Sequence, residues 1–163
     1  MSGIATKAVN SVFYKARMAA KEHNEMLSSR EGAAEVTGID RTRIARIELN
    51  TLVPYPEDVV IMADVYNAPQ LMNYFCTHEC PIGKRIAQQA DLEELNRMTI
   101  NILNALNGVS SVSQTVLAVV DDGQVTDEEM PEMERVLMLL QQVGKAATEL
   151  RIWIDKRKGE KQV

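Results

Sequence analysis

Aromatic side chains are scarce in this sequence: they make up 4% of its 163 residues, and cysteine occurs only twice. Sheets favour aromatic residues, whereas the Ala and Met that are plentiful here favour helices. The chain also lacks a run of about 18 apolar residues, which excludes a membrane-spanning helix. Its N-terminus has no charged region followed by an apolar block and a cleavage site, so no secretory signal is expected. We therefore predict an all-α cytoplasmic protein without a membrane partner.

Groupings of catalytic or metal-binding side chains are missing as well. His23 and His78 stand alone, no Ser or Cys is paired with a His in a supporting context, and no glycine-rich loop could hold a phosphate. Cys76, His78 and Cys80 fall close together, but a structural zinc site requires four ligands and the chain has no second Cys or His group. We predict no enzymatic activity, no metal site and no cofactor, and the sequence indicates no small-molecule ligand.

Charge is unevenly distributed along the chain. The formal net charge of −5 at pH 7 argues by itself against a nucleic-acid partner. However, residues 1–90 carry ten basic and ten acidic side chains, whereas residues 91–163 carry eight basic and thirteen acidic ones. The acidity therefore belongs to the second half. Any contact of the first half with DNA phosphates must depend on a local cluster of arginines.

Residues 28–49 are patterned as two short helices joined by a turn. Ser28 and Glu31 have the spacing of a capping box, which would begin the first helix. Gly38 suits the left-handed conformation that would end it. A turn at Gly38 and Ile39 then leads to the second helix.

The second helix of this pattern is amphipathic. Asp40 can cap its start, and Ile44 and Ile47 are spaced to face inward. Its other side carries four polar residues: Arg41, Thr42, Arg43 and Arg46. Two helices joined by a glycine turn, the second of which exposes Arg and Thr, form the arrangement that places a recognition helix in the major groove of DNA.

The same stretch resembles the Xre or Cro/lambda-repressor-like helix-turn-helix family. The resemblance covers roughly residues 12–76 and rests on the run from Arg30 to Asn50, with its Ile44-Ala45-x-x-Glu48 core. It implies a five-helix lambda-repressor-like domain and a regulator of transcription that binds double-stranded DNA. The residues assigned to DNA contact are Ser29, Arg30, Arg41, Thr42, Arg43, Arg46 and Asn50. The family usually carries Ser where Asp40 stands, and Asp40 would repel a nearby phosphate.

The second half of the chain is patterned as two long helices. Apolar residues recur at spacings of three and four from about Lys84 to Asp121 and again beyond Pro131, with a turn at residues 121–123. We predict a helix-turn-helix domain over residues 1–83, followed by a long antiparallel helical hairpin over residues 84–163.

The apolar stripes of this hairpin are too wide for two helices to bury. Pairing two hairpins across a two-fold axis would bury them in a four-helix bundle, so we expect a homodimer. The residues predicted at its interface are Ile102, Leu106, Val109, Val116, Leu137, Leu140 and Leu150. The alternative is that the hairpin folds back on the N-terminal domain.

Three interpretations of function follow from these patterns. The leading one is a dimeric, sequence-specific, DNA-binding transcriptional regulator. The second is a helix-turn-helix fold used for protein contacts, as in an adaptor or antirepressor, which the neutral charge of the first half and Asp40 favour. The third, a ligand- or redox-sensing regulator, rests only on the helical bundle and on Cys76 with Cys80.

Overall fold

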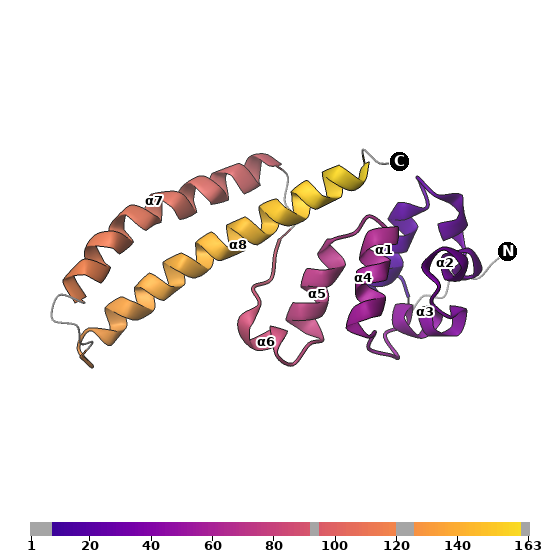
Figure 1. The fold of residues 1–163 in the computed structure, drawn as a ribbon, viewed down its shortest axis with the longest axis horizontal. Coiled ribbons are helices and arrows are strands. Elements are labelled where there is room, and N and C mark those ends of the chain that lie inside the picture. The colour runs from indigo at the N-terminus through magenta and orange to yellow at the C-terminus, as the bar shows by residue number, and fades with distance from the viewer. Residues whose placement is uncertain (1–7, 92–94, 120–125, 161–163) are drawn as a thin grey trace. The chain divides into compact units, whose positions relative to one another are not determined.

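The computed structural model describes residues 8–91, 95–119 and 126–160, and all regular secondary structure within them is helical (Figure 1). The all-α prediction is thereby confirmed. The chain divides into two compact units, one comprising Met1–Ala87 with Ile154–Val163 and the other Gln88–Trp153. Within the described ranges, none of the helices combines the length and apolarity that crossing a membrane requires.

The first unit is built from short helices around one core. They are α1 (Val12–Ala20), the 3-10 helix η1 (Glu25–Ser28), α2 (Arg30–Thr37), α3 (Arg41–Glu48), α4 (Pro56–Val65), α5 (Gln70–His78) and α6 (Gly83–Ile86). The core includes Phe13, Leu27, Ile44, Ile47 and Met62. Ile44 and Ile47 are at most 1% exposed, so the prediction that they face inward is confirmed.

The start of α2 differs from the prediction by one residue. Ser29 caps this helix, because its hydroxyl accepts a hydrogen bond from the backbone N–H of Gly32 at 3.0 Å. The predicted capping box at Ser28 and Glu31 is therefore wrong, and Ser28 instead ends η1. Gly32 permits a close approach of η1 to α2, since a Cβ there would lie 2.1 Å from the carbonyl oxygen of Met26.

The turn between α2 and α3 follows the prediction. Gly38 ends α2 with φ at 71°, in the left-handed region that glycine adopts without steric cost. The carboxylate of Asp40 caps α3 by accepting hydrogen bonds from the N–H groups of Thr42 and Arg43. Asn50 takes a left-handed conformation just after α3, with φ at 55°.

Two long helices, α7 (Leu95–Val119) and α8 (Met130–Glu160), lie side by side (Figure 1). The prediction of one continuous helix from Lys84 is wrong, because Ala87 takes an extended conformation at the end of α6. A Cβ on Gly108 of α7 would lie 3.0 Å from the side chain of Leu139 of α8, so the helices approach closely there. The turn predicted at residues 121–123 lies outside the described residues.

Candidate nucleic-acid interface

The helix α3 has a buried side and an exposed side. Ile44 and Ile47 are buried in the core of the first unit, while Arg41, Thr42 and Arg46 are exposed. The preceding helix α2 packs against α3, and the Gly38 turn and the Asp40 cap fix the path between them. The local sequence thus determines which side of α3 is presented outward.

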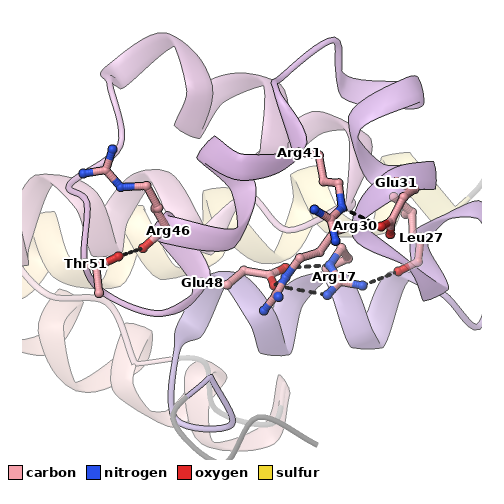
Figure 2. Close-up of polar contacts among 8 residues, drawn as sticks. All are labelled: Arg17, Leu27, Arg30, Glu31, Arg41, Arg46, Glu48 and Thr51. Carbon is pink, nitrogen blue, oxygen red and sulfur yellow. Dashed lines mark hydrogen bonds and ion pairs between the residues drawn. The ribbon is translucent and has the colours of Figure 1, made fainter. Parts of the chain in front are cut away.

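Arg46 is the arginine of α3 that is best placed for an external partner. Figure 2 shows its side chain extending away from the ion pairs at the other end of the motif. Its backbone carbonyl accepts a hydrogen bond from the Thr51 hydroxyl at 3.0 Å. Among the described residues, its guanidinium group makes neither a hydrogen bond nor an ion pair, so no carboxylate has to be displaced before it binds.

Arg41 forms an ion pair with Glu31 on α2 (Figure 2). Both side chains are well exposed, at 59% and 63%. The pKa of Glu31 is lowered, first by a backbone hydrogen bond and second by the hydrogen bond from Arg41. An ion pair this exposed is weak. Arg41 can therefore exchange Glu31 for another anion at little cost.

Arg43 points to the start of α4 instead. Its Nε donates to Asp58 Oδ2 at 2.7 Å, and its Nη2 lies 2.7 Å from the same oxygen without completing a hydrogen bond. The guanidinium carbon lies 4.0 Å from the ring centroid of Tyr55, and the hydrogen bond to Asp58 raises the pKa of Arg43. Asp58 Oδ2 also accepts from Tyr55 N. Arg43 thus connects α3 to the beginning of α4.

Arg30 is held by a buried carboxylate. Its Nε donates to Glu48 Oε2 at 2.7 Å, while Arg17 on α1 donates to both oxygens of Glu48 (Figure 2). The sequence patterns missed this cluster of Arg17, Arg30 and Glu48. One signal was present: Glu48 directly follows the inward-facing Ile47, and a buried carboxylate requires a cationic partner.

The remaining predicted contact residues flank the motif. Ser29 is exposed, although its hydroxyl is engaged in capping α2. Thr42 is exposed in the first turn of α3, and Asn50 is exposed just beyond its end. These three side chains are therefore exposed at the start of α2, at the start of α3 and just after α3, respectively.

The residues predicted at the dimer interface fall into two groups. Ile102 and Val116 on α7 and Leu150 on α8 are partly buried. Leu106, Leu137 and Leu140 are half exposed or more, at 54%, 55% and 50%. The side chain of Val109 lies outside those that the structure describes.

The segment with the two cysteines is occupied by local contacts. The ring of His78 stacks on that of Tyr74 with centroids 4.3 Å apart, and its Nδ1 lies 2.8 Å from the hydroxyl oxygen of Thr77. Cys80 Sγ accepts from the N–H of Gly83, and neither Cys76 nor Cys80 forms a disulfide. In the part of the chain that the structure describes, no three His, Cys, Asp or Glu side chains gather as metal ligands would.

Comparisons with protein-family models, curated proteins and solved structures find no match for this chain.

Proposed function

We propose that this protein is a sequence-specific DNA-binding transcriptional regulator of the Xre or Cro/lambda-repressor-like type, with α2 and α3 as its helix-turn-helix. The observation that supports this most is the exposure of Arg41, Thr42 and Arg46 on one side of α3 while Ile44 and Ile47 hold the other side in the core. A helix anchored in this way can enter a major groove without rearranging its own domain.

Arg46 is the proposed base-reading residue. A guanidinium group can donate two hydrogen bonds to O6 and N7 of a guanine, which is the most common specific contact in the major groove. Arg46 has both donors available among the described residues. Thr42 and Arg41 lie on the exposed part of the same helix and supply further donors to bases or phosphates.

Arg30 and Arg43 take supporting roles in this proposal. Their guanidinium groups are bound by Glu48 and Asp58 at 2.7 Å. They therefore fix the position of α3 rather than contact bases. Of the arginines on α3, Arg41 and Arg46 therefore remain as the proposed DNA contacts.

We propose further that the protein acts as a homodimer through a helical hairpin of α7 and α8. A single helix-turn-helix contacts one half-site, whereas a two-fold dimer contacts two and so gains affinity and specificity. The half-exposed Leu106, Leu137 and Leu140 support this part of the proposal, because a second copy would remove them from water.

The test is a selection of duplexes from a randomised pool by the full-length protein, followed by titration of the selected duplex at about 50 and 200 mM salt. We expect a motif with two half-sites. Arg46→Ala should lose ~1–3 kcal/mol of binding free energy for that duplex. Arg151→Ala removes the same charge from an exposed position on α8 and should leave the affinity unchanged. A pool in which no duplex is enriched would contradict the proposal.

The second candidate function is that of a protein-binding adaptor built on the same fold. It is favoured by the ion pairs of Arg41 with Glu31 and of Arg43 with Asp58, which neutralise much of the cationic character of α3. An adaptor would bind no duplex even at the lower salt concentration. In that case Arg46→Ala and Arg151→Ala would behave alike in the duplex titration.

A further inference from the structure

The helix α7 carries no charged side chain over most of its length. Arg97 lies in its first turn, and every residue from Met98 to Val119 is apolar or uncharged. A helix with one side in water normally carries charged residues on that side. The neighbouring α8 does so, with Glu132, Glu134, Arg135, Lys145 and Arg151 among its residues.

This uncharged helix also exposes large apolar side chains. Leu103, Leu106 and Leu117 are 55%, 54% and 73% exposed, and Ile100 is 56% exposed. Another part of the same helix is buried, since Ala105 is only 6% exposed. α7 therefore has an apolar surface besides its buried side.

Leu103, Leu106 and Leu117 share one side of α7. The separation of three residues between Leu103 and Leu106 and of fourteen between Leu103 and Leu117 matches a heptad repeat, which keeps residues on one stripe of a helix. The stripe thus presents three large, exposed apolar side chains along one side of α7.

We infer that this stripe binds the same stripe on a second copy of the chain, so that two α7 helices meet at the centre of the dimer. In an isologous contact, each surface meets its own copy, and like charges at its centre would repel. The stretch 98–119 of α7, which has no charged residue, avoids this repulsion. Contacts between different proteins are commonly selected by complementary charges beside the apolar positions, and this part of α7 offers none. The inference rests on the dimer of the proposed function and names its surface.

The experiment measures the mass of the full-length protein by light scattering without DNA, at about 50 µM and in a dilution series. We expect the wild-type chain to be a dimer. Leu106→Lys should raise the dissociation constant of the dimer by about 100-fold or more, since it places two uncompensated cations in an apolar contact. The matched control is Met138→Lys on α8, which is 54% exposed and should remain dimeric. Circular dichroism of each variant verifies that its helices are retained.

A mixing experiment tests whether the partner is a second copy. Leu106→Glu alone should be monomeric like Leu106→Lys, and an equimolar mixture of the two should recover the dimer mass because unlike charges then meet. A monomeric wild-type chain would overturn the inference, as would a Leu106→Lys variant that dimerises as well as Met138→Lys does. Because no DNA is present, these results are independent of whether the protein binds a duplex.

Discussion

Arg17 on α1 and Glu48 at the end of α3 lie 31 residues apart in the sequence and are joined by two hydrogen bonds, Nε to Oε1 at 2.6 Å and Nη2 to Oε2 at 3.2 Å. Both residues are almost fully buried, at 3% and 1% exposure. Arg17 also donates to the carbonyl oxygen of Leu27 on η1, and Arg30 on α2 donates to Glu48. One carboxylate thus connects α1, α2 and α3 and fixes the end of the proposed recognition helix.

Removing one member of this pair should cost much more stability than removing both. Glu48→Gln leaves the buried guanidinium of Arg17 without a counter-charge, and we expect the free energy of unfolding to fall by ~3–5 kcal/mol. The double variant Arg17→Met with Glu48→Leu fills the same space with apolar groups and should stay close to the wild type. Urea unfolding followed by circular dichroism measures both. A double variant as unstable as Glu48→Gln would contradict this account.

The sequence indicated the parts of the motif that depend on local chemistry. Gly38, Asp40 and the inward spacing of Ile44 and Ile47 are each determined within a few residues of chain. The pairing of Arg17 with Glu48 depends on how helices far apart in the sequence meet, so no hydrophobic periodicity predicts it. The charge pattern alone therefore overstated how many arginines of the motif are available to a ligand.

The break after α6 was missed for a different reason. Residues 84–91 contain neither proline nor glycine, and most of them are good helix formers. The chain nevertheless leaves the helix at Ala87, whose φ and ψ are −84° and 141°. Intrinsic propensity is a weak signal that tertiary structure can override, so no local residue pattern marks where the second unit begins.

Arg43 and Asp58 should behave as a structural pair rather than as DNA contacts. Arg43→Ala and Asp58→Ala should each lower the melting temperature, because each removes the connection between α3 and the start of α4. The double variant should lose less than the sum of the two, as expected for residues in direct contact. The sequence preference selected from a randomised duplex pool should be the same in Arg43→Ala as in the wild type. A changed preference at one base pair would instead make Arg43 a reading residue.

Glu31 should weaken DNA binding by competing for Arg41. Glu31→Gln removes the ion pair and leaves the guanidinium to a phosphate or base, so the affinity for the selected duplex should rise. Glu35→Gln is the control, since it removes one negative charge from an exposed position on the same helix. Both variants should bind better than the wild type, and Glu31→Gln should bind best.

The salt dependence of duplex binding provides a second measurement of this competition. If Arg41 gains a phosphate contact in Glu31→Gln, the slope of log affinity against log salt should become steeper by about one. Equal affinities and equal slopes in Glu31→Gln and Glu35→Gln would show that only the overall charge of α2 matters.

Tyr66 at the end of α4 should be a site where a substitution stabilises the protein. The residue is 3% exposed, and its hydroxyl group is buried without a hydrogen-bond partner among the described residues. Tyr66→Phe keeps the ring in the core and removes the unsatisfied group, so we expect the free energy of unfolding to rise by ~1 kcal/mol. Urea unfolding at neutral pH measures the change, and a clear loss of stability would indicate that the hydroxyl makes a contact.

The dependence of the free energy of unfolding on pH in the alkaline range tests the burial of Tyr66 independently. The pKa of Tyr66 is raised above its ordinary value of 10.0, first by burial of the phenol and second by the negative charge of Glu48. In the unfolded chain the phenol loses its proton near pH 10, whereas the folded protein retains it. The contribution of Tyr66 to stability is therefore complete below about pH 10 and is lost as the pH rises towards the folded pKa. Tyr66→Phe should lose less stability than the wild type above that pH, which urea unfolding at a series of alkaline pH values measures.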